Sequence, residues 1–283
     1  MRIVVTGAYG QLGSELRRLL GADAVPLYIN TLDLPGALEK TLGDLCPDAV
    51  INCAAYTQVD RAESDPRQCW AVNATAVEHL ARACARLDCP LVQISTDYVY
   101  GGESGRTTPY CEDDPPSPQG VYAQTKREGE QAAARHLRKH LIVRTCGLYT
   151  RPANQRARHF VKTMLRLGKA GKEPRVVADQ HCTPSYVPHV ARAVLFLLGV
   201  PSGPPAPWGI YHVVNRGATT WYEFAAEIFR QAGIDVSLRP ITTAEYGAAA
   251  PRPAYSVLDT TKYHALGGPA MPTWRDALEE YFA

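Results

Sequence analysis

Apolar and polar positions follow two different periods from the start of the chain. The short run "RIVV" (residues 2–5) holds three consecutive apolar residues, and the following "QLGSELRRLL" repeats leucine at positions 12, 16, 19 and 20. A short continuous apolar run is typical of a buried strand, whereas spacings of three and four place side chains on one face of a helix. These segments therefore predict a strand followed by a helix, the opening of a strand–helix–strand unit.

The alternation continues through the first half of the chain. Apolar runs predict further strands in "VPLYI", "AVINCAAY", "PLVQIS" and "LIVRTCGLY", and helical spacing predicts helices from Asn73 to Leu87 and around "GVYAQTKREGE". Strands that are apolar throughout, with helices between them, are typical of a parallel sheet covered on both faces. We therefore expect an α/β protein with a Rossmann-type, doubly wound parallel sheet.

Beyond about residue 150 the pattern becomes less regular. The expected elements there are helices near Phe160–Leu167, Val190–Leu198 and Thr220–Gln231, and strands within "PRVVADQ" and "IYHVV". We interpret residues 1–149 as a dinucleotide-binding domain and residues 150–283 mainly as a smaller C-terminal substrate-binding region. Two later segments, near 174–180 and 210–215, are expected to return to the first sheet.

Composition and charge narrow the range of partners. The 283 residues include 30 Lys and Arg against 28 Asp and Glu, without a long basic block, so a nucleic-acid interface is not indicated. The amino terminus lacks the layout of a signal peptide, and the longest apolar segment, "VARAVLFLLGV", is too short to span a bilayer and contains Arg192. We expect a cytoplasmic protein without membrane contacts that acts on a small molecule.

The eight cysteines form no CxxC pair, and several fall in predicted strands or helices. Paired spacings are what disulfide frameworks and metal sites show, so their absence favours small buried apolar side chains instead. The sequence predicts no metal site.

A glycine-rich turn, "GAYGQLG", follows the first predicted strand and opens the first predicted helix. Glycines in this context let the backbone turn tightly and approach a pyrophosphate, which the helix amino terminus then binds. A tight turn without a ligand is the alternative interpretation. The segment predicts cofactor contacts from Gly7, Gly10, Gln11, Leu12 and Gly13.

The ends of the second and third predicted strands are less specific. No acidic residue that would hold an NAD ribose stands directly after "VPLYI", and no cation that would favour NADP follows before Lys40, so the coenzyme preference stays open. Asp33 and Leu34 are candidates for the adenine side, although a turn explains them equally well. Small residues after the third strand, Ala54 and Ala55, would let a cofactor cross the sheet edge, although alanines there could also be simply core; Tyr56, which follows them, is a further cofactor-binding candidate.

Polar residues follow the next predicted strand, and a Tyr–Lys pair stands on the helix after it. Thr96 and Asp97 in "ISTDYVYGG" come directly after a buried strand, at the ligand-binding edge, although they would also serve as a turn and cap. Tyr122 and Lys126 in "GVYAQTKREGE" are four apart and share a helix face. A nearby ammonium lowers the pKa of a phenol, so the pair could be a tuned proton donor; a surface pair is the alternative.

Together these features resemble the extended short-chain dehydrogenase/reductase family, and more closely the dTDP-4-dehydrorhamnose reductase family, from about residue 1 to 283. The motifs that carry the closer resemblance are "GQLG", "NCAAYTQVDRAES", "STDYVYGG", "PYCEDDPPSPQGVYAQTKREGE", "FVKTMLRL", "VVADQ" and "ATTWYEFAAEIF". The resemblance implies a nucleotide-sugar substrate whose C4 keto group is reduced with NADPH or NADH. It also implies a role for Tyr122 as proton donor, for Thr96 as a hydrogen-bond partner of the same oxygen, and for Lys126 in binding the nicotinamide ribose and lowering the pKa of Tyr122.

For the substrate, the resemblance implies that Asp97 and Tyr98 approach the sugar. Arg252, in "PRPAYS", matches a family segment near the nucleotide, with a structural role as the alternative. The chain departs from the family at Gly147, where the family typically has a tryptophan that forms a wall for the sugar. The expectation is a sugar pocket that differs from the usual one.

Two alternatives to the reductase remain open at this point. An epimerase or dehydratase on the same scaffold would retain oxidised cofactor, and "STDY" offers Asp97 as the acid that a dehydratase needs. A non-catalytic nucleotide-binding regulatory subunit is the other, although Thr96, Tyr122 and Lys126 argue against it. The sequence leaves a monomer or a homodimer open.

Overall fold

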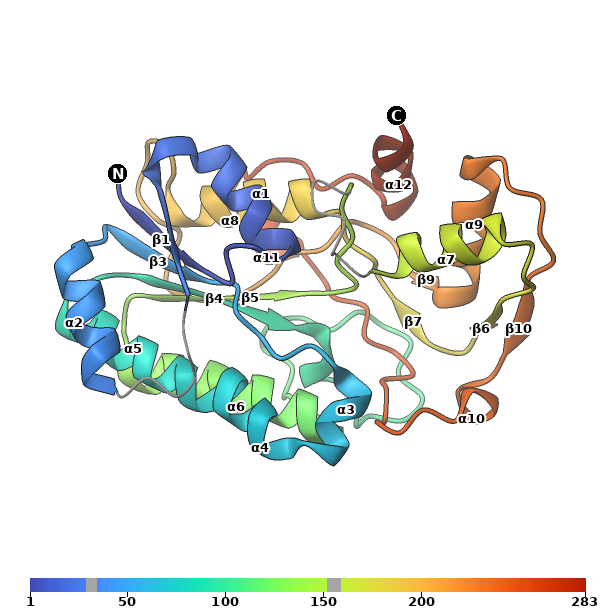
Figure 1. Ribbon diagram of the computed structural model, residues 1–283, viewed down its shortest axis with the longest axis horizontal. Helices are drawn as coiled ribbons and strands as arrows, with labels where there is room; N and C mark the ends of the chain where they lie inside the picture. The colour runs from blue at the N-terminus through green and yellow to red at the C-terminus, as the bar shows by residue number, and fades with distance from the viewer. Residues whose placement is uncertain (29–34, 152–158) are drawn as a thin grey trace.

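Six parallel strands form the central sheet of the computed structural model, which describes residues 1–28, 35–151 and 159–283 (Figure 1). Their order is β2-β1-β3-β4-β5-β8, and every neighbouring pair is parallel. The strands are β1 (Ile3–Thr6), β2 (Ala24–Leu27), β3 (Ala49–Asn52), β4 (Leu91–Thr96), β5 (His140–Thr145) and β8 (Gly209–His212). The predicted α/β, Rossmann-type sheet is confirmed. The order reverses between β1 and β3, the position where such sheets bind ligands beyond the carboxyl ends of their strands.

Helices cover both faces of this sheet. Figure 1 shows α1 (Gln11–Leu20), α8 (Val187–Leu198) and α11 (Thr261–Ala265) on one side, and α2 (Pro35–Leu45), α5 (Ala76–Arg86) and α6 (Gly120–His136) on the other. Each layer has its own apolar core: Leu16 of α1 packs with Val190 of α8, and Leu42 of α2 packs with Leu80 of α5. Two short helices, α3 (Val59–Ser64) and α4 (Pro66–Trp70), and a π-helical turn (Ala71–Thr75) lead into α5.

A separate layer lies beyond the carboxyl ends of the strands. It packs α7 (Phe160–Lys169), α9 (Trp221–Ala232) and α12 (Trp274–Phe282) around Phe224 and Trp274. Two small sheets complete it: β6 (Arg175–Val177) pairs in parallel with β10 (Arg239–Ile241), and β7 (His181–Cys182) pairs antiparallel with β9 (Thr219–Thr220). The helix α10 (Thr243–Tyr246) follows β10.

Two expectations about the strands need correction. The segment 174–180 was predicted to return to the first sheet, but its strand β6 pairs with β10, because α9 packs against β6 and the chain after α9 returns to lie beside β6 in the same direction. The second strand, predicted as "VPLYI", ends at Leu27, so Tyr28 is not part of it, and Ile29 lies outside the described residues.

Burial of the cysteines is mixed. Five of them are buried, but Cys46 and Cys111 are exposed, against the prediction, because both lie on loops between elements. In the ranges that the structure describes, no three or more His, Cys, Asp or Glu side chains are grouped to hold a metal. Within the same ranges, no helix combines the length and the apolar character needed to cross a bilayer.

Candidate active site

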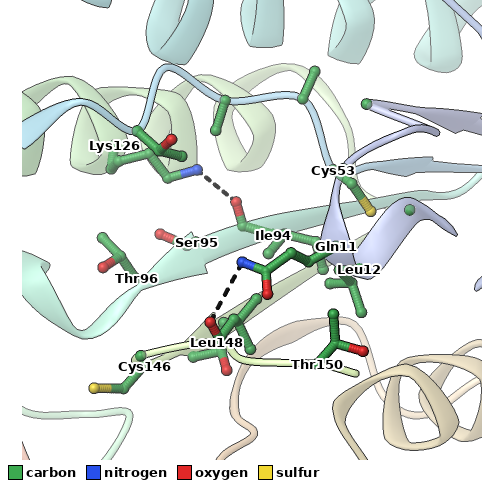
Figure 2. A pocket seen from close by; sticks show the side chains of 18 of the residues that line it. Gln11, Leu12, Cys53, Ile94, Ser95, Thr96, Lys126, Cys146, Leu148 and Thr150 are labelled. Atoms are coloured by element: carbon green, nitrogen blue, oxygen red, sulfur yellow. Dashed lines mark hydrogen bonds between the residues drawn. The ribbon is translucent and has the colours of Figure 1, made fainter. Parts of the chain in front are cut away.

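A pocket of about 1080 Å³ opens at the carboxyl edge of the sheet. It brings together most of the residues that the sequence singled out. Those that line it are Gly7, Gly10, Gln11, Leu12, Gly13, Ala54, Ala55, Thr96, Asp97, Tyr98, Tyr122, Lys126 and Gly147. Figure 2 shows how side chains from β4, α1, α6 and the segment after β5 converge on it. This convergence follows from the parallel sheet, whose strands all end at this edge.

The glycine turn is shaped by close backbone approach. Gly7 has a φ of +58°, and a Cβ there would lie 2.5 Å from the backbone carbonyl carbon of Cys53. A Cβ on Gly13 would lie 2.3 Å from the carbonyl oxygen of Gly7. Gly10, the N-cap of α1, has no side chain that could cap the helix. The N–H groups in the first turn of α1 therefore face the pocket without a capping side chain. An anionic diphosphate fits this helix terminus.

Two buried polar atoms of the pocket lining lack partners among the described residues. Gln11 donates from Nε2 to the carbonyl oxygen of Leu148 at 3.4 Å (Figure 2), and its Oε1 has no hydrogen bond. The Thr145 hydroxyl, at the end of β5, is also buried without one. Because buried polar groups are normally paired, these atoms fit a ligand that carries its own donors and acceptors, as the amide and ribose of a nicotinamide cofactor do.

Lys126 is held at the edge of the sheet. It lies in the second turn of α6, is 4% exposed, and donates from Nζ to the carbonyl oxygen of Ile94 at 2.6 Å (Figure 2). Burial lowers its pKa to about 8, although the nearby Glu130 carboxylate opposes that shift. Lys126 is therefore an ammonium group at neutral pH that is close to losing its proton.

Tyr122 lies one turn earlier on the same helix and packs edge-on against Tyr98, with ring centroids 5.8 Å apart. Burial raises the pKa of Tyr122 above its ordinary value, and hydrogen bonding with the Thr96 hydroxyl lowers it by less. The predicted lowering of this pKa by Lys126 is wrong for this structure, because desolvation dominates and the ammonium donates to Ile94 instead. Tyr122 is thus a neutral phenol that retains its proton.

A hydrogen-bonded chain continues from Thr96 into the interior. The Thr96 hydroxyl donates to Asp97 Oδ1 at 3.1 Å and accepts from the Tyr98 N–H at 3.2 Å, so it caps the turn that follows β4 and also lines the pocket. Asp97 accepts from the Ser256 hydroxyl at 2.6 Å on its other oxygen, and burial raises the pKa of Asp97. Sequence reasoning assigned no role to Ser256, the last residue of "PRPAYS", because it is 159 positions away from its partner.

A buried ion pair supports the helix behind Lys126. Arg144 of β5 donates to both carboxylate oxygens of Glu130 at 2.9 and 2.8 Å, and both side chains are fully buried. The Ser95 hydroxyl donates to the same carboxylate at 2.6 Å. Glu130 is four residues after Lys126, so this network fixes the helix face that carries Tyr122 and Lys126 against the sheet. No sequence motif indicated this ion pair.

Four predicted residues are not placed in the pocket lining. Tyr56 pairs through its backbone with the Asn73 side chain and is not part of the lining. Arg252 lies outside the lining and donates to both oxygens of Asp60 at 3.0 and 2.7 Å, which favours its structural alternative. Asp33 and Leu34 lie outside the described residues.

Gly147 lines the pocket beside an aromatic ring that the sequence analysis did not anticipate. Its φ is +52°, and a Cβ there would lie 3.1 Å from Cη2 of Trp221. Trp221, the first residue of α9, also lines the pocket. The pocket therefore has an aromatic surface at this position despite the glycine.

Comparison with known proteins extends over nearly the whole chain. Residues 1–283 match the RmlD substrate binding domain family. The chain is 41% identical over 288 residues to dTDP-4-dehydrorhamnose reductase of Streptomyces griseus (99% of this chain, 93% of that protein). It is 39% identical over 289 residues to a probable dTDP-4,6-dihydroxy-2-methyloxan-3-one 4-ketoreductase of Streptomyces antibioticus (100% and 95%). The fold is similar to that of dTDP-4-dehydrorhamnose reductase of Bacillus anthracis in complex with NADP, with a TM-score of 0.91 and 37% identity (99% and 98%).

Proposed function

Because the chain belongs to the RmlD substrate binding domain family, together with the dTDP-4-dehydrorhamnose reductases, we propose that it reduces the C4 keto group of dTDP-4-dehydro-L-rhamnose to give dTDP-L-rhamnose. The reductant is NADPH or NADH. The observation that carries the proposal is the meeting of Thr96, Tyr122 and Lys126 with the glycine turn in one pocket.

The cofactor contacts follow from the fit of the pocket. The amino terminus of α1 and the glycines before it would hold the diphosphate, and Lys126 would bind the nicotinamide ribose. Ala54 and Ala55 leave room along the sheet edge, and Gln11 offers Oε1 to the nicotinamide end. Asp33 and Leu34 stay candidates for the adenine side. When bound, the reduced nicotinamide supplies the hydride.

The protein's own part in the reaction is proton supply and charge stabilisation. As C4 accepts a hydride, negative charge develops on the C4 oxygen, and the Tyr122 phenol donates its proton there. The raised pKa of Tyr122 keeps that proton in place until the oxygen becomes basic. The Thr96 hydroxyl, whose one proton points to Asp97 in this structure, would hold the same oxygen after that proton turns from Asp97 to the substrate. Solvent then returns a proton to Tyr122.

The remaining assignments concern the substrate contacts, the oligomeric state and the location of the protein. Residues 150–283 would mainly bind the nucleotide sugar, with Tyr98 and Gly147 at the sugar. Arg252 would contact the nucleotide after leaving Asp60. A cytoplasmic monomer or homodimer that contacts neither nucleic acid nor membrane is part of the same proposal.

A second substrate is favoured by one observation. The Streptomyces antibioticus relative acts at C4 of a different dTDP sugar, and Gly147 alters the part of the pocket that would meet the sugar ring. The reaction type that the names of both relatives give, reduction at C4 of a dTDP-linked compound, is the same. An epimerase or a binding subunit would instead show no net consumption of cofactor.

The direct test mixes the protein with NADPH, or with NADH, and dTDP-4-dehydro-L-rhamnose. We expect one molecule of reduced nicotinamide to be oxidised for each dTDP-L-rhamnose formed, and the two rates to give the coenzyme preference. Tight cofactor binding without oxidation would contradict the proposal and favour the regulatory subunit.

The lowered pKa of Lys126 predicts how cofactor binding depends on pH. Below a pH of about 8 the side chain is an ammonium that attracts the cofactor, and above it the charge is progressively lost. The dissociation constant for NADPH, measured by fluorescence titration, should therefore be flat near neutral pH and rise above about pH 8. Its slope should not exceed about tenfold per pH unit, the limit for one proton.

Two variants check the origin of this dependence. Lys126→Met should bind NADPH more weakly, and its dissociation constant for NADPH should no longer rise above about pH 8. Lys139→Met removes a lysine that pairs with Asp88 outside the pocket, so it should behave like wild type. A rise that persists unchanged in Lys126→Met would contradict the assignment.

A further inference from the structure

The part of the pocket beyond the cofactor site has two chemically different sides. Thr96, Asp97 and Tyr122 form a polar side where the reacting carbonyl binds in the proposed reaction. Gly147 and Trp221 line the same pocket and present no side chain and an aromatic ring, whereas the neighbouring Cys146 thiol contacts Asp97 and belongs to the polar side. The second side is therefore almost without strong hydrogen-bonding side chains.

Trp221 is fixed in place by the start of its helix. The Thr220 hydroxyl accepts from the Glu223 N–H at 3.1 Å, and the Glu223 carboxylate accepts from the Thr220 N–H at 3.0 Å, so a complete capping box sets the first turn of α9. The Trp221 ring also packs against Phe160, with centroids 4.8 Å apart. This support makes the ring a rigid surface.

The backbone at Gly147 excludes a competing side chain. A Cβ there would lie 3.1 Å from the Trp221 ring and 3.2 Å from Cα of Pro184, and the φ of +52° disfavours any residue with a Cβ. A large side chain at position 147 would thus overlap sterically with the Trp221 ring. The glycine is what lets the Trp221 ring border the pocket here.

We infer that Trp221 forms the wall that contacts the apolar face of the sugar and its C6 methyl group, and so makes the pocket selective for 6-deoxy sugars. The inference rests on the proposed function. In that reaction C4 lies at Thr96 and Tyr122, and the methyl group is attached to C5, the next ring atom. The methyl is the apolar substituent nearest the reacting carbon, and the apolar side of the pocket is the surface that matches it. A C6 hydroxyl there would lose its hydrogen bonds to water without gaining equivalent ones.

The test compares dTDP-L-rhamnose with dTDP-L-mannose, which differs only in its C6 hydroxyl. Calorimetric titrations in the presence of NADP⁺ should show wild type binding the 6-deoxy compound roughly 10- to 100-fold more tightly, the range an apolar pocket reaches against an added hydroxyl. In Trp221→Ala that preference should fall below about threefold, and dTDP-L-rhamnose should bind roughly tenfold or more weakly. The affinities for dTDP and NADP⁺ should stay within about twofold, since the inference places only the sugar against the ring.

Two further variants make the result decisive. Trp208→Ala removes a half-buried tryptophan outside the pocket and should keep the wild-type preference. Trp221→Phe keeps an aromatic ring against Phe160 and should retain part of the preference; it also keeps the inference testable if the alanine variant does not fold.

Three results would overturn the inference, and they can be told apart. If both Trp221 variants keep the wild-type preference for dTDP-L-rhamnose over dTDP-L-mannose, the ring does not determine this selectivity. The proposed function would then be unaffected. An equal loss of dTDP and dTDP-L-rhamnose affinity would show that the ring acts on the nucleotide or on the fold. Wild type that binds dTDP-L-rhamnose no more tightly than dTDP would overturn the proposed function together with this inference.

Discussion

Replacing Tyr122 with Phe should lower kcat/KM for the sugar by about 10²- to 10⁴-fold, the range that a positioned general acid contributes. In the proposed reaction the phenol, which burial keeps protonated by raising its pKa, donates the proton, and phenylalanine has no proton to give. The ring itself should still pack against Tyr98, so the shape of the pocket is retained. Initial rates of NADPH oxidation over a range of sugar concentrations measure the effect.

The dissociation constant for NADPH should change little in the same variant. A matched control is Tyr246→Phe, because Tyr246 is exposed on α10 and outside the pocket lining; it should keep the wild-type rate. Tyr122→Phe with more than about a tenth of the wild-type kcat/KM would mean that another group donates the proton.

Replacing Glu130 with Gln should lower the free energy of unfolding by about 3–5 kcal/mol, the usual cost of breaking a buried ion pair from one side. The Arg144 guanidinium is fully buried, and without the carboxylate its charge would be uncompensated. Although burial raises the pKa of Glu130, the Arg144 hydrogen bonds and charge lower it below its ordinary value, so the native partner is ionised. Urea denaturation of both proteins at neutral pH measures the difference.

Glu128→Gln is the matched control on the same helix. Glu128 pairs with Arg135 at 3.1 Å, but both side chains are substantially exposed, so its loss should cost less than about 1 kcal/mol. Equal stabilities for the Glu130 and Glu128 variants would show that the buried pair does not hold α6 to the sheet. The Glu130 variant should also have a still lower Lys126 pKa, because Glu130 opposes the effect of burial there.

The sheet and most of the pocket could be predicted because both follow from local pattern. Each apolar run was read as one buried strand, and each strand of a parallel sheet ends at the same edge. Polar or small residues near the carboxyl end of a strand, such as Thr96 and Ala54, therefore lie together in the pocket at that edge. The YxxxK spacing placed Tyr122 and Lys126 on one helix face without any knowledge of the tertiary structure.

The features that could not be predicted depend mostly on contacts between distant parts of the chain. Ser256 reaches Asp97, and Trp221 reaches Gly147, only through the packing of the C-terminal layer. The pairing of β6 with β10 is of the same kind, since both strands are three residues long and carry little pattern of their own. The helix α2 was also missed, although Leu38 and Leu42 are four residues apart and both buried.

The pKa of Tyr122 was predicted in the wrong direction for a physical reason. Sequence spacing places Lys126 beside it, but the spacing does not say how deeply the phenol is buried or which acceptor takes the ammonium. In the folded protein that acceptor is the carbonyl oxygen of Ile94. The consequence for mechanism is that Tyr122 begins the reaction protonated, as a reductase requires.

The most direct test of the account uses NADPH labelled with deuterium on the transferable position of the nicotinamide ring. The protein, this cofactor and dTDP-4-dehydro-L-rhamnose are mixed in ordinary water, and the product is examined by mass spectrometry and proton NMR. The account predicts dTDP-L-rhamnose with one deuterium at C4 and a solvent-derived proton on its oxygen. Product without deuterium at C4, or no product while NADPH is bound, would contradict the assignment of this pocket as a reductase site.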